Sequence, residues 1–231
     1  MDHQAVLKYL DNFVNDPRVV TYSSLPESEK QTLPHSWQNI LSAQGSERVA
    51  RTVAQWDTYR PDFDDLPEYL KLHLQGVELI HHDGVYTLLY AVRAGESGKT
   101  LYYEGRNPKL QQAPASVAAV WQKFPATFRR FYAEFHNGWY HLSSGAMGPL
   151  PIESIFPLSD EEWGILDDIG PQPVDMKSTF AFFSNGAGTY LCVEFQADKM
   201  QTLLWSSKEA PKYGLDFWPV LDSWSVIGLD V

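Results

Sequence analysis

Residue types that commonly carry out chemistry occur in this sequence without the spacing that catalysis or metal binding needs. The adjacent residues His81 and His82 could ligate a metal, but neighbouring residues of a strand point to opposite faces. The segment 143–148 lacks the Gly-x-Ser-x-Gly pattern of a nucleophile elbow. Adjacent carboxylates such as Asp167 and Asp168 do not flank a substrate from two sides. We therefore predict no catalytic residue and no metal site.

The one cysteine and the glycine-rich loop also favour structural roles. Cys192 lies among apolar residues of an expected strand, where a thiol is usually an inert filler, and a single cysteine excludes an internal disulfide. A phosphate-binding loop is followed by a helix, but residues 189–195 after the loop 185–188 alternate as a half-buried strand does. We expect a β-hairpin at this loop and no cofactor.

Composition and charge limit the classes of protein and partner. The chain has 231 residues, of which 44% are hydrophobic and 14% aromatic, enough to fill a core. Its formal net charge of -11 disfavours direct binding of nucleic acid or anionic lipid. The sequence contains neither an apolar stretch long enough to span a membrane nor a visible export signal. These features predict a cytoplasmic protein.

The acidic residues are concentrated in one segment. Residues 131–176 contain no Lys or Arg and eight acidic residues, and a smaller acidic group at 61–68 is flanked by Arg60 and Lys71. Two interpretations explain this clustering about equally well. The acids form either a solvated surface that keeps the protein soluble or a surface that recognises a basic partner. On the second interpretation, the candidate binding residues are Asp160, Glu161, Glu162, Asp167 and Asp168, with Asp62, Asp64 and Asp65.

The first half of the chain, residues 1–110, predicts helices followed by a β-hairpin. Apolar residues recur at helical spacing before Pro17, and Ser24 with Glu27 has the spacing of a helix-capping box. Residues 76–92 contain two strand-like runs around the turn Asp83-Gly84, and residues 99–105 could add a third strand. A polar connection at 107–116 is the expected boundary, and residues 1–110 form either a separate unit or an extension of the same domain.

The second half, residues 111–231, predicts an α+β core. Phe128, Phe131, Tyr132 and Phe135 share one face of a helix, and a strand through residues 139–142 should follow. Ser159 and Glu162 predict the start of a short helix, in which Asp167 and Asp168 would lie near the C-terminal end. Two strands joined by the loop 185–188, a further strand at 199–207 and a terminal helix after Asp216 complete the expected order.

This order of motifs resembles the SUKH superfamily over about half of the chain, from residue 124 to 225. The segments that carry the resemblance are FYAEFHNGW, LPIESIFPLSDEE, FFSNGAGTYLCVEF and an aromatic terminal helix. Thr189 stands where many members have an acidic residue. The resemblance implies an α+β fold with a mainly antiparallel sheet flanked by helices, here extended by an N-terminal helix and a β-hairpin. It also implies a binding module of the kind that neutralises toxins exchanged between competing bacteria.

Three hypotheses for function follow. The first is an immunity protein that binds a cognate toxin domain with a basic surface and neutralises it stoichiometrically. The second is a regulatory or scaffold interaction module without a toxin, as the eukaryotic members of the superfamily suggest. The third is a small hydrolase that uses scattered His and Asp/Glu residues. A toxin gene directly upstream would favour the first, and an isolated housekeeping locus would favour the second.

Overall fold

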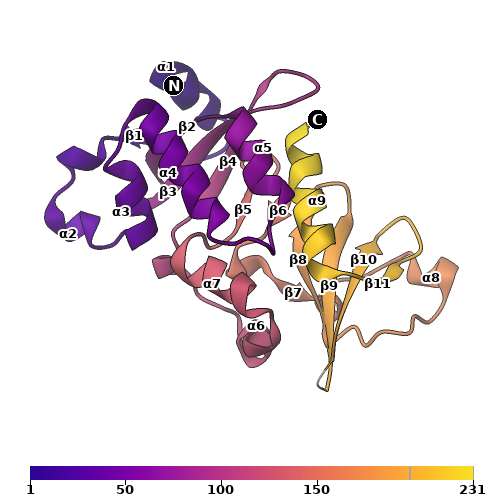
Figure 1. Ribbon diagram of the computed structural model, residues 1–231. Helices are drawn as coiled ribbons and strands as arrows, with labels where there is room; N and C mark the ends of the chain where they lie inside the picture. The colour runs from indigo at the N-terminus through magenta and orange to yellow at the C-terminus, as the bar shows by residue number, and fades with distance from the viewer. Residues whose placement is uncertain (198, 231) are drawn as a thin grey trace.

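The computed structural model describes residues 1–197 and 199–230. It shows an α+β protein with two antiparallel sheets, an N-terminal helix and helices packed around the sheets (Figure 1). The helices are α1 His3–Leu10, α2 Glu27–Lys30, α3 His35–Leu41, α4 Gly45–Asp57, α5 Asp65–His73, α6 Ala115–Val120, α7 Ala126–Glu134, α8 Leu166–Ile169 and α9 Phe217–Asp230. Short 3-10 turns occupy Tyr22–Ser24, Pro108–Leu110, Trp121–Lys123, Ile152–Ser154 and Leu158–Asp160.

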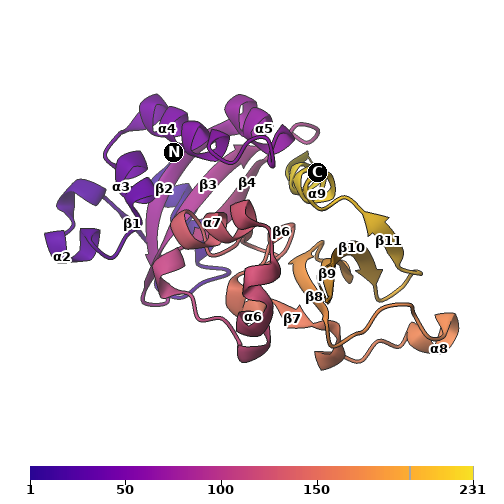
Figure 2. The same cartoon turned by 60° about the horizontal axis from the view of Figure 1, so that its bottom comes forward.

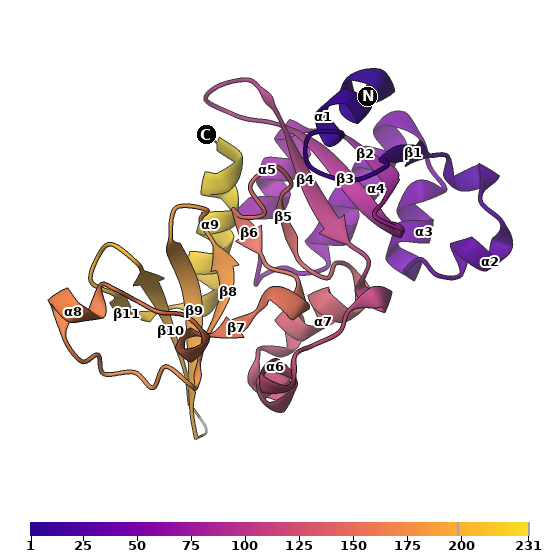
Figure 3. The ribbon, with the colours of Figure 1, turned by 180° about the vertical axis from the view of Figure 1, so that it is seen from behind.

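The first sheet has the strand order β1-β2-β3-β4-β5, and each neighbouring pair is antiparallel. Its strands are β1 Arg18–Val20, β2 Leu74–His82, β3 Val85–Arg93, β4 Thr100–Arg106 and β5 Trp139–His141. The predicted hairpin around Asp83-Gly84 is confirmed as the β2–β3 turn, and the third strand is confirmed as β4. Helices α4 and α5 lie over one face of this sheet, and α1 lies over the other (Figures 1 and 3).

The second sheet has the order β11-β10-β9-β8-β6, and β7 also pairs with β8. Its strands are β6 Gly148–Pro149, β7 Phe156–Pro157, β8 Thr179–Ser184, β9 Thr189–Gln196, β10 Lys199–Ser206 and β11 Lys212–Leu215. The loop 185–188 joins β8 to β9 and is closed by a backbone hydrogen bond from Asn185 to Thr189. The prediction of a hairpin at this glycine-rich loop is therefore confirmed.

The two sheets meet where β5 passes β6. A side chain on Gly148 would place its Cβ only 1.9 Å from the carbonyl oxygen of Trp139, so only glycine allows this approach of the two backbones. The main core continues across this junction. Trp56 of α4 packs against Phe131 of α7 and Trp139 of β5, with ring centroids 5.4 and 5.2 Å apart. Residues 1–110 and 111–231 thus share one hydrophobic core.

The predicted aromatic face of α7 is confirmed. Phe128, Phe131, Tyr132 and Phe135 are all fully buried, and the ring of Phe128 lies 5.4 Å from that of Phe182 in β8. The terminal helix α9 begins at Phe217, directly after Asp216, as expected, and covers the same face of the second sheet.

Two expected helix starts are wrong. Ser159 lies in a 3-10 turn that ends at Asp160, Glu161 is extended, and the only helical turn described nearby is the four-residue α8. Asp167 and Asp168 therefore lie in the first turn of α8, where the helix dipole favours acids. Ser24 does not cap a helix either, because its hydroxyl donates to the carbonyl of Thr21 and α2 begins only after Pro26.

Candidate binding surface

The two adjacent histidines diverge from each other, as the strand geometry predicts. His81 lies beside the ring of Tyr86, whereas the imidazole of His82 is buried between two carboxylates. His82 Nε2 lies 2.5 Å from Glu104 Oε1, and His82 Nδ1 lies 3.0 Å from Asp83 Oδ2. Tyr140 donates its hydroxyl to the other oxygen of Glu104 at 2.6 Å. No local sequence pattern predicts this hydrogen-bonded cluster, because His82, Glu104 and Tyr140 come from three different strands.

Burial and hydrogen bonding shift the pKa values of His82 and Glu104 in opposite directions. Burial alone would lower the pKa of His82, but its bonds to Glu104 and Asp83 outweigh burial and raise that pKa. Burial alone would raise the pKa of Glu104, but the bond to His82 and the Tyr140 hydroxyl lower it. Hydrogen bonds from Asn15 and His82 lower the pKa of Asp83 to about 2. The imidazolium and both carboxylates therefore form a satisfied ionic cluster between strands.

The pair His82–Glu104 is enclosed by the sheet, whereas Asp83 is exposed in the β2–β3 turn. His82 and Glu104 are only 7% and 4% exposed, and both carboxylate oxygens of Glu104 are already hydrogen-bonded. A general base needs a free lone pair within reach of a substrate proton. These hydrogen bonds hold strands of the sheet together. Among the described residues, no hydroxyl nucleophile is hydrogen-bonded to His82.

The side chains of His136 and Cys192 are also held in the core, and that of His141 is partly buried. His136 is fully buried, which lowers its pKa well below the ordinary value, and its Nε2 lies 2.6 Å from the Tyr90 hydroxyl. Burial also lowers the pKa of His141. Burial raises the pKa of the Cys192 thiol, so this cysteine is protonated at neutral pH. Across residues 1–197 and 199–230, no three His, Cys, Asp or Glu side chains group in a way that could hold a metal ion.

The five acids singled out from residues 160–168 are all exposed and lie on one long loop. We call residues 158–176, between β7 and β8, the acidic loop. Within the described part of the chain, none of Asp160, Glu161, Glu162, Asp167 or Asp168 is in an ion pair. Figure 2 shows this loop, with α8 at its tip, at the end of the molecule farthest from the first sheet. The acids thus present uncompensated negative charge at one end.

Aromatic side chains lie beneath these acids. The acidic loop packs on the outer face of the second sheet through Trp163, whose indole nitrogen donates to the carbonyl of Leu158 at 2.7 Å. The ring of Tyr190 in β9 lies 5.8 Å from that of Trp163 and 5.6 Å from that of Phe156. All three rings are only partly buried. Neither Trp163 nor Tyr190 was among the predicted binding residues, although the alternation of β9 places the Tyr190 side chain on the other face of the strand from the core residue Leu191.

The second acidic group is different and lies elsewhere. Arg60 forms ion pairs with Asp64, with Asp57 at 2.9 Å and with Glu68 at 2.7 Å. Arg60 therefore neutralises part of the negative charge of this acidic group. The structure does not bring Asp62, Asp64 and Asp65 together with the acidic loop, because they lie at the start of α5 beside α9 (Figures 1 and 2). Asp65 is exposed and Asp62 is partly buried, and neither is in an ion pair among the described residues.

A buried acid that the sequence analysis missed lies next to this group. The carboxylate of Asp222 in α9 accepts the backbone N–H groups of Asp64, Asp65 and Leu66 at 2.8, 2.7 and 3.0 Å. Burial raises the pKa of Asp222, and these three bonds partly offset that rise. Asp222 therefore caps the N-terminus of α5 and serves the fold rather than a partner.

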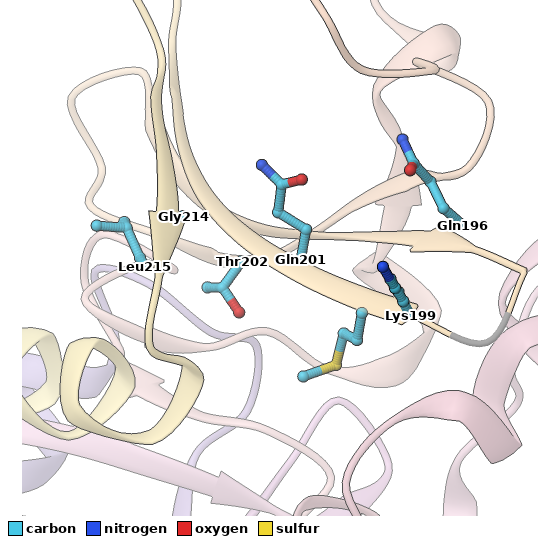
Figure 4. Close-up of a pocket in the computed structure, with 7 residues that line it drawn as sticks. Gln196, Lys199, Gln201, Thr202, Gly214 and Leu215 are labelled. Atoms are coloured by element: carbon cyan, nitrogen blue, oxygen red, sulfur yellow. The ribbon is translucent and has the colours of Figure 1, made fainter.

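A hollow of about 440 Å³ opens where β11 ends beside β10. Figure 4 shows Gln196 and Gln201 pointing to one side of the strands and Thr202 to the other, with Leu215 of β11 at one end. The lining contains one ionisable side chain, Lys199. Because this hollow lacks an acid–base pair, we assign no chemistry to it.

The fold and these contacts define an α+β protein with an acidic, aromatic-backed surface. Comparisons with protein-family models, with curated proteins and with solved structures each find no match. Within the part of the chain that the structure describes, every helix is too short or too polar to cross a membrane.

Proposed function

We propose that this protein is a stoichiometric protein-binding module, and specifically an immunity protein that covers a basic surface of a cognate toxin domain. One observation carries the proposal. Five exposed acids, in no ion pair among the described residues, lie on the same loop as the partly exposed Trp163, whose ring packs against Tyr190; a protein interface likewise combines aromatic side chains with a charged rim.

The two parts of this surface have different roles in binding. The acids attract a cationic partner and accelerate encounter, while Trp163, Tyr190 and Phe156 supply apolar area that is buried on contact. A nuclease toxin holds nucleic acid through a basic patch, and such a patch would fit this surface. Occupying the patch would prevent substrate binding without any turnover by the immunity protein.

A SUKH-like arrangement of residues 124–225 is part of the proposal. The order of α7, β5, the β8–β9 hairpin, β10 and α9 supports it. A regulatory module without a toxin would use the same surface and differ only in its partner. The hydrolase alternative gains no support from the geometry, because His82, the histidine with the most carboxylate contacts, has both nitrogens occupied within the sheet.

The test uses the product of the neighbouring gene, expressed in a sensitive host with and without this protein. We expect survival with the wild-type protein. The variant Asp160→Asn, Glu161→Gln, Glu162→Gln should protect less, with a slower association rate measured on the purified pair. Added salt should also slow association of the wild-type protein, because screening at physiological ionic strength acts over about 8 Å.

A matched variant controls for total charge. Asp11→Asn, Glu27→Gln, Glu96→Gln removes three exposed acids that lie outside the acidic loop. This control should protect the host and associate at the wild-type rate. Equal behaviour of the two triple variants would show that the acidic loop only keeps the protein soluble. Lack of protection by the wild-type protein would instead favour the regulatory alternative.

A further inference from the structure

The C-terminal helix α9 carries few charged residues, although one of its sides faces solvent. Its inward side buries Phe217, Leu221 and Leu229 against the core. A helix that is apolar all round is normally enclosed by protein, whereas an outer helix carries charged residues on its solvent side. The solvent side of α9 consists of the exposed Pro219, Ser223 and Ile227, with Val220 and Trp224, which are partly exposed and also pack against the core. We call these five residues the α9 stripe.

The α9 stripe contains no charged side chain. Asp222, the acid in the middle of α9, is only 4% exposed because it turns inward to cap α5. Ile227 is 56% exposed, and Ser223 and Pro219 are also exposed. In a protein with a net charge of -11, an outward helical face without charge is the place where a second molecule of the same charge meets least repulsion.

A hollow lies directly beside the α9 stripe. It has a volume of about 290 Å³ and is lined by Trp224 of the stripe, by Leu204 of β10, and by Glu209 and Lys212 near β11. Glu209 and Lys212 are exposed and form no ion pair with each other or with another described residue. Asn185, Thr189 and Ser206 also line the hollow, so it combines a largely polar wall with the side chains of Leu204 and Trp224 and with one charge of each sign that is unpaired among the described residues.

We propose that the α9 stripe and this hollow form the interface with a second copy of the same chain. A two-fold axis brings the same patch of both copies together, so each residue type must find its complement on an identical surface. The uncharged stripes satisfy this condition, and Glu209 of one copy would face Lys212 of the other. A basic toxin offers no comparable match to an uncharged helix face. The dimer is therefore separate from the toxin surface, and neither proposal depends on the other.

Salt should act on the two associations in opposite directions. Two copies of charge -11 repel each other outside the uncharged contact, and salt screens this repulsion. Salt also weakens the two exposed Glu209–Lys212 pairs, but such pairs contribute little, so the loss of net repulsion should dominate. Dimerisation should therefore strengthen as salt is added, whereas binding of a basic toxin should weaken. This difference separates failure of the dimer proposal from failure of the proposed function.

The experiment is analytical ultracentrifugation of the full chain over a range of protein and salt concentrations. We expect a reversible dimer for the wild-type protein. Ile227→Glu and Ser223→Lys introduce charges of opposite sign into the α9 stripe, and each should raise the dissociation constant at least about tenfold. Leu110→Glu is the control, because Leu110 is 52% exposed, similar to Ile227, but lies between β4 and α6. This control should leave the dimer unchanged.

Charge reversal tests the hollow. Glu209→Lys and Lys212→Glu should each weaken the dimer, and the double variant should restore it. Ser223→Lys changes an exposed residue, so it still tests the dimer interface if Ile227→Glu unfolds the protein. A wild-type protein that stays monomeric at every concentration would overturn the proposal. A dimer that tolerates both substitutions in the α9 stripe would overturn it as well.

Discussion

The carboxylate of Asp222 accepts the backbone N–H of Leu66 at 3.0 Å, across 156 positions of sequence. With the N–H groups of Asp64 and Asp65, this bond completes the N-terminus of α5 from a residue of α9. A helix cap is usually supplied by the residue just before the helix, and here it comes from the other end of the chain. The contact joins the C-terminal helix to the N-terminal half.

Asp222→Ala should lower the free energy of unfolding by about 2 kcal/mol, because three N–H groups at the start of α5 lose their charged acceptor. Urea denaturation measures the change. Asp222→Asn keeps one acceptor oxygen and should cost less. An Ala variant as stable as the wild-type protein would show that water replaces the carboxylate without loss.

The pair His82–Glu104 should give stability a defined pH window. The raised pKa of His82 adds stability that is present below the ordinary value of 6.5 and is lost as pH rises through the raised value. The lowered pKa of Glu104 adds stability that is present above the ordinary value of 4.5 and is lost as pH falls through the lowered value. The contribution of the pair should therefore be greatest between pH 4.5 and 6.5.

Chemical denaturation at pH values inside and above this window tests the prediction. Glu104→Gln leaves a buried imidazole without its charged partner and should lower stability by about 3 kcal/mol inside the window. As pH rises above this window, the stability of the variant should fall much less than that of the wild-type protein. If both proteins declined equally, groups other than His82 and Glu104 would be responsible.

Gly105 and His136 are in close contact across the core. A Cβ on residue 105 would lie 2.4 Å from two atoms of the His136 ring, which is itself stacked 3.8 Å from Phe135. Gly105→Ala should therefore lower the unfolding free energy by about 2 kcal/mol. The exposed Gly164→Ala, with no atom within 4 Å of its added Cβ, should be nearly neutral.

A double-mutant cycle identifies the clash. If the His136 ring causes the cost of Gly105→Ala, that cost should shrink when His136 is first replaced by Ala. An unchanged cost in the His136→Ala background would attribute the loss to the β4 backbone instead.

Trp163 should hold the acidic loop on the second sheet. Trp163→Ala removes the bond to Leu158 and the ring contacts with Tyr190 and Trp205, and should cost about 2 kcal/mol because the side chain is only partly buried. Hydrogen exchange in residues 160–170 should become faster. Trp163→Phe keeps an aromatic ring and loses the hydrogen bond, so it should cost about 1 kcal/mol. Unaltered exchange in the Ala variant would mean that other side chains hold the loop.

The sequence predicted those elements whose signals are local. The strand at 189–195, the aromatic face of α7 and the turns at 83–84 and 185–188 depend on residues within a few positions of each other. The expected half-burial of that strand was wrong, because the acidic loop covers its second face and residues 191–195 are all buried. The exposure of Asp160, Glu161 and Glu162 was expected, because isolated carboxylates avoid burial.

Local sequence signals gave wrong predictions where packing against another element determined the backbone conformation. Ser159 and Glu162 have the spacing of a capping box, but the chain is extended at Glu161 because Trp163 reaches back to Leu158 and packs on the second sheet. The burial of an aromatic ring outweighs a cap that contributes about 1 kcal/mol. Helix starts are weak predictors for this reason.

The sequence by itself determined the α+β composition, the hairpins and the clustering of acids, since each follows from neighbouring residues and net charge. Only the tertiary structure decided which distant residues meet. The pairing of His82 with Glu104 depends on the register of β2, β3 and β4, and the contact of Asp222 with α5 depends on how α9 docks. Such contacts are made by chain segments that fold back on each other, and one sequence carries no local signal for them.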